Sequence, residues 1–279
     1  MSIVFKILRK KREKESVREG FFELFQNVYH RSLNDAEWRH LFLEAPYGES
    51  TLLVAVDEAL GAQHPVGAAN LIGQRLQAGK SHVEYFFYTT SAILPEYRDL
   101  KTYLDMVDLL KNITRDEHKC MILAFPNTTA FPLLTRLCGF RGLNQERIVK
   151  IACRGNWGTY LKPMASDGGV ILDEPFLSWR FRHKDYFYDL VQDKVVIGKV
   201  YEGALDVLEV LEESFEKCLT GKLPRNTAAF SGAYILERRL RDPQGACAQK
   251  TQEIRPVCFP LHEDCPVRFM PSLLMSDVY

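Results

Sequence analysis

The chain has 279 residues, 36 basic and 36 acidic side chains, and 46% hydrophobic residues. This composition is typical of a folded globular protein and excludes an intrinsically disordered chain. The formal net charge of zero argues against a dedicated nucleic-acid-binding protein, because such proteins usually carry a strongly basic surface. At about 100–200 residues per domain, the length favours two domains over one large domain.

No apolar run approaches the roughly 20 residues that a membrane-spanning helix needs. The apolar stretch at the N-terminus is too short for a secretory signal, and it precedes the basic residues instead of following them. Seven cysteines, an odd number scattered along the chain, do not suggest a disulfide framework. The sequence therefore predicts reduced thiols and a cytoplasmic location.

Residues 1–19 are rich in charge and have a small apolar edge. The favoured interpretation is a solvated helical lead-in, and the alternative is a segment that lies on an anionic membrane surface. Between residues 21 and 42 the apolar side chains recur at helical spacing. Asn34 or Ser32 is expected to cap a second helix there.

The pattern then alternates between strand-like and helical segments, separated by turn residues. The first half is expected to contain strands over 51–57, 66–76 and 81–94, a helix over 99–115, a strand over 120–125, a helix over 128–137 and a strand over 140–153. This order predicts a mixed α/β domain over residues 1–153.

Residues 154–170 are rich in glycine and proline and are predicted to link this domain to a second one over 171–279. The second domain opens with an aromatic segment over 176–181. It is then expected to contain strands over 186–192, 194–201 and 204–211, helices over 212–220 and 228–241, and a strand over 252–259. The two halves share a loose plan of helical entry, antiparallel strands, and helices alternating with strands.

Three stretches of the first half carry a resemblance to a known family: residues 37–48 with Trp38 and Pro46, the run Ile93-Leu94-Pro95-Glu96-Tyr97-Arg98, and residues 125–140 with Phe125-Pro126-Asn127 and Cys138-Gly139-Phe140. In this order they resemble the GCN5-related N-acetyltransferase superfamily, most of all its bacterial members associated with surface-polysaccharide and secondary-metabolite pathways. From Phe176 onward the chain resembles a more diverged copy. The resemblance implies an α/β fold with mixed sheets, built from tandem acyltransferase domains.

The resemblance also implies a binding site for the acyl donor. The pantetheine of acetyl-CoA or another acyl-CoA would contact Ile93 and Leu94, in the gap between the fourth and fifth strands. The pyrophosphate would meet the first turn of the following helix, where backbone N–H groups are unsatisfied, with contacts from Arg98, Leu100, Lys101 and Thr102. Asn127 would lie near the thioester.

Two positions depart from the family pattern. The turn over residues 98–103 has no glycine, and Asp99 adds a negative charge where an anion would bind. Leu134 stands where many members carry a tyrosine that protonates the departing thiolate. A phosphopantetheine thioester on an acyl carrier protein lacks the adenosine pyrophosphate, and is therefore the alternative donor.

The expected general base lies on the strand over 81–94. Glu84 is the only acidic residue in that strand, and partial burial is expected to raise its pKa. The alternative is a carboxylate that faces solvent. His82, two residues earlier on the same face, is the second candidate.

Two further groups of residues are candidates for a binding site. Trp179 and Arg180 suit either a substrate pocket or a packed core at the entry to the second domain. The cysteines and histidine near the C-terminus lack the CxxC spacing of a zinc site, so no metal is predicted; they are Cys247, Cys258, His262 and Cys265.

The preferred function is an N-acyltransferase that moves an acyl group by direct attack to an amine of a small metabolite or nucleotide sugar. The alternative is a catalytically silent binding or assembly protein with the same fold. The expected partners are the small-molecule amine and, for a carrier-bound donor, an acyl carrier protein. No nucleic-acid partner is expected, and a homodimer remains open.

Overall fold

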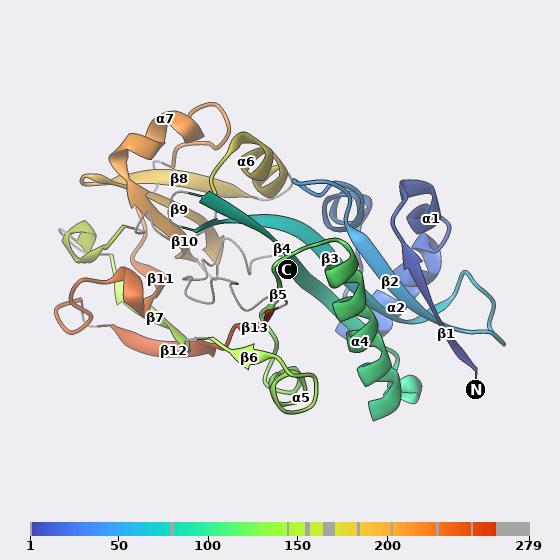
Figure 1. The fold of residues 1–279 in the computed structure, drawn as a ribbon. Coiled ribbons are helices and arrows are strands. Elements are labelled where there is room, and N and C mark those ends of the chain that lie inside the picture. The colour runs from blue at the N-terminus through green and yellow to red at the C-terminus, as the bar shows by residue number, and fades with distance from the viewer. Residues whose placement is uncertain are drawn as a thin grey trace. The chain divides into compact units, whose positions relative to one another are not determined.

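The computed structural model describes residues 2–78, 81–143, 145–153, 157–163, 171–182, 185–201, 203–226, 229–246 and 248–260. These residues form two compact units (Figure 1). Unit 1 contains residues 2–75, 83–141 and 257–260, and unit 2 contains the other described residues. The chain therefore crosses between the units several times, whereas the sequence predicted a single crossing in a linker over 154–170.

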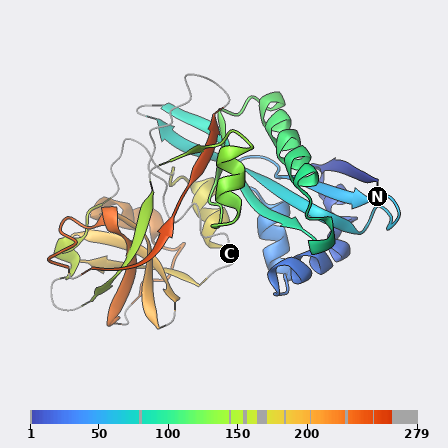
Figure 2. The same ribbon diagram turned by 90° about the horizontal axis from the view of Figure 1, so that it is seen from below.

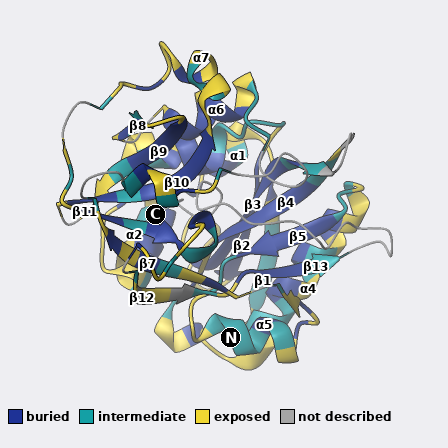
Figure 3. Ribbon diagram, turned by 90° about the vertical axis from the view of Figure 1, so that its left-hand side faces the viewer, coloured by how far each residue is buried: buried dark blue, intermediate teal, exposed yellow. Residues whose placement is uncertain are grey.

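Unit 1 is built on a seven-stranded mixed sheet with the order β1-β2-β3-β4-β5-β13-β6. Its strands are β1 (Ile3–Leu8), β2 (Thr51–Asp57), β3 (Pro65–Ala78), β4 (Ser81–Ile93), β5 (Met121–Ala124), β6 (Arg141–Gly142) and β13 (Val257–Pro260). Strands β4 and β5 run parallel, whereas β13 is antiparallel to β5. Every residue of β2 is buried, as the dark blue colour in Figure 3 shows.

Helices cover both faces of this sheet (Figure 2). One face carries α1 (Lys11–Glu15), α2 (Arg18–Tyr29), α3 (Asp35–Trp38) and the π-helical turn Arg39–Leu43, and the other carries α4 (Leu100–Asp116). The helix α5 (Ala130–Arg136) follows β5, and a 3-10 turn, Pro95–Tyr97, follows β4. Asn34 caps α3 by accepting a hydrogen bond from the Glu37 backbone N–H, as predicted.

The N-terminal segment is a strand, so the prediction of a helical lead-in was wrong. Residues 3–8 pair with β2 from Ile3↔Asp57 to Leu8↔Leu52. Their β-branched and aromatic side chains suit a strand, and Ile3 and Phe5 pack against the core. Lys14, in the short helix that follows, is buried and donates hydrogen bonds to the Phe42 carbonyl and the Ser50 hydroxyl.

Unit 2 is built on a six-stranded mixed sheet with the order β12-β7-β11-β10-β9-β8. Its strands are β7 (Glu146–Ala152), β8 (Tyr186–Val191), β9 (Lys194–Tyr201), β10 (Ala204–Glu212), β11 (Gly232–Leu236) and β12 (Gln249–Ile254). The helices are α6 (Glu174–Phe181) and α7 (Glu216–Leu219), with 3-10 turns at Trp157–Tyr160, Glu213–Phe215 and Glu237–Arg239. Strands β10 and β11 run parallel, as β4 and β5 do in unit 1.

The two sheets exchange strands. In unit 1, β5 lies between β4 and β13, and β13 comes from the end of the described chain. In unit 2, β11 lies between β10 and β7, and β7 follows the first half of the chain directly. The strand predicted over 252–259 is accordingly split, because Arg255 and Pro256 separate β12 in one sheet from β13 in the other.

Two other predicted elements differ from the structure. The helix predicted over 228–241 is replaced by β11 and the 3-10 turn Glu237–Arg239. Pairing of β11 with β7 and β10 outweighs the local helical pattern here. The strand predicted over 140–153 is divided between β6 and β7, which belong to different sheets.

Candidate functional site

The end of β4 extends beyond its parallel partner. The ladder with β5 runs from Phe86↔Ile122 to Tyr88↔Ala124, and β5 ends there, whereas β4 continues to Ile93. Thr90 has a φ of 52°, a left-handed conformation that is costly for a β-branched residue. This strained turn of the backbone lies just after the last rung of the ladder. The backbone from Thr89 to Ile93 therefore lies outside the β4–β5 ladder.

Hydroxyl groups surround this end of β4. Ser91 is exposed; its hydroxyl accepts a hydrogen bond from the Tyr88 hydroxyl, and its carbonyl accepts one from the Tyr29 hydroxyl, each at 2.9 Å. Burial raises the pKa of Tyr29 to about 12, so its phenol remains protonated at neutral pH. Ser91, Tyr29 and Thr90 were not predicted from the sequence, because no local pattern marks their convergence.

Ile93 and Leu94, which the resemblance assigned to pantetheine, already form backbone hydrogen bonds within the protein. The carbonyl of Ile93 accepts a hydrogen bond from Arg98 Nε at 2.8 Å. The Leu94 N–H donates to the Val66 carbonyl, and the Leu94 carbonyl accepts from the Tyr97 N–H, each at 2.9 Å. These contacts hold the turn after β4 in place and reduce the number of backbone groups that remain for a ligand.

The N-terminus of α4 is capped by its own aspartate. Asp99 accepts hydrogen bonds from the Thr102 N–H at 2.8 Å and from the Thr102 hydroxyl at 2.7 Å. These bonds hold the pKa of Asp99 below its ordinary value. A carboxylate thus occupies the donor group at Thr102 that the resemblance assigned to the pyrophosphate.

The other residues of this turn are exposed. Leu100 is 53% exposed although it is apolar. Lys101 is exposed and forms an ion pair with Asp105, which raises the pKa of Lys101. Arg98 is also exposed. The turn therefore presents two cationic side chains and one apolar side chain to solvent.

Asn127 acts as a cap for the turn before α5. Its side-chain oxygen accepts hydrogen bonds from the Thr129 and Ala130 N–H groups at 3.1 and 2.8 Å. The side chain is exposed. Asn127 comes three residues after the end of β5, and the place near the thioester that the resemblance implied for it stays a prediction.

Glu84 is held by two cations. Arg75 Nη2 lies 2.9 Å from Oε1, and Lys119 Nζ lies 2.7 Å from Oε2. The hydrogen bond from Lys119 is the main reason that the pKa of Glu84 is lowered. The expectation that burial would raise this pKa was therefore wrong, because the ion pairs outweigh desolvation.

His82, the second candidate base, is exposed and is grouped with unit 2 instead of unit 1. Trp179 and Arg180 lie in α6 and are buried, with exposed fractions of 6% and 1%. The Arg180 guanidinium lies 5.4 Å from the centre of the Tyr186 ring. This burial favours the packing interpretation of both residues over the pocket interpretation.

Unit 2 also has a parallel pair of central strands, and a buried ion pair lies beyond the end of their ladder. The parallel ladder of β10 and β11 covers Leu205↔Ala233 and Asp206↔Tyr234, and β10 has a bulge just after it. Beyond that bulge, Arg239 forms two contacts with the Glu209 carboxylate, at 2.8 and 3.0 Å. Both side chains are buried.

Comparison with solved structures identifies the fold. The GCN5-related N-acetyltransferase from Kribbella flavida is 15% identical, with a TM-score of 0.63 over 95% of this chain and 73% of that chain. The GCN5-related N-acetyltransferase from Anabaena variabilis ATCC 29413 and Eis1 from Mycobacterium abscessus are each 11% identical, with TM-scores of 0.59 and 0.56 over 93% of this chain and 73% of theirs. The chain therefore has the fold of the GCN5-related N-acetyltransferases, and the predicted mixed α/β class is confirmed.

The sequence itself matches no family model and no curated protein. Within the described ranges, no helix is long and apolar enough to cross a membrane. The same residues contain no cluster of three metal-ligating side chains. Of the cysteines and histidine weighed for zinc, Cys258 is buried in β13, and Cys247, His262 and Cys265 lie outside the described residues.

Proposed function

We propose that the protein is an N-acyltransferase and that unit 1 carries the reaction. The observation that supports this is the end of β4, which continues past its parallel partner with a left-handed residue at Thr90. Backbone N–H groups of a strand end are fixed dipoles that can stabilise negative charge without reorganising. In unit 2 the Glu209–Arg239 pair follows the corresponding ladder, so unit 2 is the less suitable candidate.

The proposed reaction is a direct transfer. The amine nitrogen loses a proton to a base and attacks the thioester carbon, whose oxygen takes up negative charge. Backbone N–H groups between Thr89 and Ile93 would stabilise this oxyanion. The C–S bond then breaks, the thiolate takes a proton, and an amide is released. Two phenols contact Ser91 at this strand end, those of Tyr29 and Tyr88, and the Tyr29 phenol, protonated at neutral pH and bonded to the Ser91 carbonyl, is the proposed proton donor.

The donor is proposed to be an acyl phosphopantetheine thioester, held beside Ile93 and Leu94. The aspartate cap at Thr102 favours a carrier-protein donor over acyl-CoA, because a pyrophosphate would compete with the Asp99 carboxylate for the same N–H group. Arg98 and Lys101, which already contact the Ile93 carbonyl and Asp105, are the cationic side chains of this turn that a phosphate would meet. An acyl carrier protein and a small-molecule amine are the proposed partners, in the cytoplasm; a homodimer stays a prediction.

The base remains a choice between Glu84 and His82. A carboxylate with two cationic partners is a weak proton acceptor. The ion pairs with Arg75 and Lys119 therefore also suit a structural role for Glu84 in β4. His82 is grouped with unit 2, so Glu84 is the candidate base that unit 1 itself supplies.

Thermal unfolding with acetyl-CoA, CoA and acetyl-phosphopantetheine in parallel tests the donor. A ligand that binds only the folded state stabilises it by about 2.7 kcal/mol at a hundred times its dissociation constant. We expect stabilisation by the phosphopantetheine thioester, and a smaller effect of CoA. Turnover is then followed as thiol release with a panel of amines.

The second candidate function is a catalytically silent binding protein. The aspartate cap at α4 and the buried, apolar Leu134 favour it, since neither residue serves donor binding or proton transfer. Absence of stabilisation by CoA and by both thioesters, together with no thiol release from an acylated carrier protein, would support this candidate and contradict the proposed activity.

A further inference from the structure

One buried polar side chain of unit 1 has no role in the reaction steps described above. Asn70 lies in β3 opposite Leu52 of β2, and its exposed fraction is 0%. Its neighbours along the strand, Ala69 and Leu71, are apolar and equally buried. A buried amide is destabilising unless its polar atoms find partners. Leucine has the same branched shape without polar atoms, so the contacts of the amide should explain its presence.

The amide nitrogen of Asn70 faces two oxygen atoms. Nδ2 donates to the Leu41 carbonyl at 2.8 Å and to the Thr89 hydroxyl at 3.4 Å. Because a carbonyl can only accept, the contact with Leu41 fixes which end of the amide carries the hydrogens. Leu41 lies in the π-helical turn Arg39–Leu43, in which a carbonyl bonds to the N–H five residues later. For Leu41 that residue is Pro46, which has no N–H, and Asn70 supplies a donor instead.

The amide oxygen of Asn70 has no donor among the described residues. A buried acceptor without a donor costs free energy. Stability alone would therefore not favour an asparagine at this position, and a buried group of this kind requires an explanation. The explanation lies with the two N–H donors on the other side of the amide.

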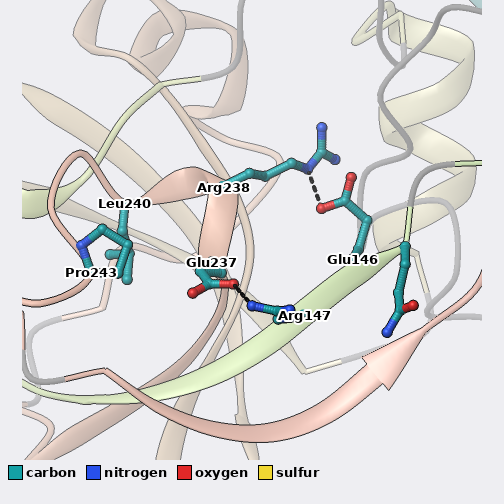
Figure 4. A pocket seen from close by; sticks show the side chains of 7 residues that line it. Glu146, Arg147, Glu237, Arg238, Leu240 and Pro243 are labelled. Atoms are coloured by element: carbon teal, nitrogen blue, oxygen red, sulfur yellow. Dashed lines mark hydrogen bonds and ion pairs between the residues drawn. The ribbon is translucent and has the colours of Figure 1, made fainter.

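The charged side chains of unit 2 are arranged differently. Arg238 Nε lies 3.0 Å from Glu146 Oε2, and Arg147 Nη1 lies 3.5 Å from Glu237 Oε2, beside a pocket of about 440 Å³ (Figure 4). Each of these groups faces an opposite charge, so the pairs explain one another without a ligand. Asn70 instead connects two segments of backbone through uncharged oxygen atoms.

The second contact of Asn70 leads to the strained residue at the end of β4. Thr89 Oγ1 lies 3.4 Å from Thr90 Oγ1, and both side chains are buried. Thr90 has the left-handed φ of 52°. A β-branched residue keeps such a conformation only where the surrounding structure holds it there. The contacts from Asn70 through Thr89 to Thr90 supply this support.

We propose that Asn70 is a positioning residue that holds Thr90 in its left-handed conformation and thereby fixes the direction of the backbone N–H groups at the end of β4. This inference rests on the proposed function, in which those N–H groups face the negative charge that develops on the thioester oxygen. Asn70 acts through Thr89 and Thr90, and not by contact with a substrate.

The first test needs no substrate. Backbone ¹³C chemical shifts and the HN–Hα coupling of residue 90 report its φ, and NMR of the full chain compares them between variants. Asn70→Leu keeps the branched shape and removes both donors, so we expect residue 90 to lose its left-handed signature. Thr89→Val removes only the hydroxyl that links the two residues, and should shift residue 90 in the same direction; it decides if Asn70→Leu does not fold. Gln74→Leu removes another buried amide of β3 and is the matched control, with residue 90 as in the wild type.

The second test is turnover. Asn70→Leu should lower kcat at least tenfold and change the KM for the thioester less than about threefold, because the contacts with the substrate remain. Glycine adopts a positive φ without support. In a Thr90→Gly background the same substitution of Asn70 should therefore lower kcat less than about twofold. Equal losses in both backgrounds would show that Asn70 does not act through Thr90.

A left-handed signature at residue 90 that persists in Asn70→Leu and in Thr89→Val would overturn the proposal. The same change in Gln74→Leu would also overturn it, because the loss of any buried amide would then have this effect. If the wild type or Thr90→Gly shows no turnover, the NMR comparison decides. Absence of acyl transfer in the wild type would contradict the proposed function, and the conformation of residue 90 would still show whether Asn70 holds it.

Discussion

Arg239 and Glu209 form a buried ion pair with two contacts, from Nη2 to Oε2 at 3.0 Å and between Nε and Oε1 at 2.8 Å. Glu209 Oε1 also accepts a hydrogen bond from the Val210 N–H. The pair follows the parallel ladder of unit 2, where β10 has its bulge. In unit 1 the strand after the corresponding ladder carries exposed Ser91 instead. This difference favours unit 1 as the unit that takes the acyl donor.

Breaking this pair should destabilise the protein strongly. Arg239→Met leaves the Glu209 carboxylate buried without its cation, which typically costs about 3–5 kcal/mol. Chemical denaturation measures the loss. The double variant Glu209→Met/Arg239→Met removes both charges and is expected to recover much of the stability. A loss below about 1 kcal/mol in the single variant would contradict a buried, mutually dependent pair.

Asp99 should weaken the binding of CoA. Asp99→Asn keeps a side-chain acceptor for the Thr102 N–H but removes the negative charge, so we expect tighter CoA binding with little change in stability. Asp99→Ala removes the cap and should cost about 1 kcal/mol of stability. Calorimetric titration with CoA checks the affinity. The same CoA affinity in Asp99→Asn and wild type, at low salt, would show that the carboxylate does not exclude the pyrophosphate.

The pH profile of turnover should distinguish the two candidate bases. A general base must be deprotonated, so activity falls as the pH drops through its pKa. The pKa of Glu84 lies below its ordinary value of 4.5, so a rate that depends on Glu84 would persist below that pH. We expect this profile, and a rate that falls well above that pH would contradict the assignment of the base to Glu84.

Variants at the two positions provide the control for this profile. Glu84→Gln should reduce turnover by at least tenfold, because an amide cannot take the proton of the amine; it also loses the ion pairs with Arg75 and Lys119. His82→Ala should leave turnover and stability nearly unchanged, because the side chain is exposed and grouped with unit 2. The opposite order of effects would assign the base to His82.

Lys14 should make stability depend on pH in the alkaline range. Burial lowers its pKa to about 8 from an ordinary value of 10.5. Below pH 8 the amine is charged in both states, whereas between pH 8 and 10.5 it is charged only in the unfolded chain. The unfolded state then binds more protons, so stability rises with pH by up to about 1.4 kcal/mol per unit. Lys14→Met should lack this rise, measured as the difference between the two proteins in urea denaturation; parallel curves would contradict it.

The sequence predicted the elements whose signals are local. The antiparallel strands of each half, the helix after β4 and the Asn34 cap were found from periodicity and capping residues, and the mixed α/β class followed from their order. The charge of Asp99 at the helix N-terminus was also visible, and the structure shows that it caps the helix. Local patterns therefore carried much of the fold and part of the site.

The features that the sequence did not predict depend on distant partners. The pKa of Glu84 is lowered mainly by Lys119, which lies 35 residues further along the chain, two residues before β5. The positive φ of Thr90 has no sequence signal, because threonine is a residue that normally avoids that conformation. The strand predicted over 252–259 contains a proline, but nothing local indicates that its two halves join different sheets.

The placement of β13 next to β5 has a consequence for synthesis on the ribosome. At about 5–20 residues per second, about 7 to 27 seconds separate the emergence of β5 from that of its neighbour β13. Throughout that interval one edge of β5 lacks its native partner, and an unpaired strand edge readily accepts a strand from another molecule. A nascent chain that stalls between the two strands is thus exposed to pairing with a copy of itself, so the speed of elongation through the second half bears on the yield of correctly folded protein.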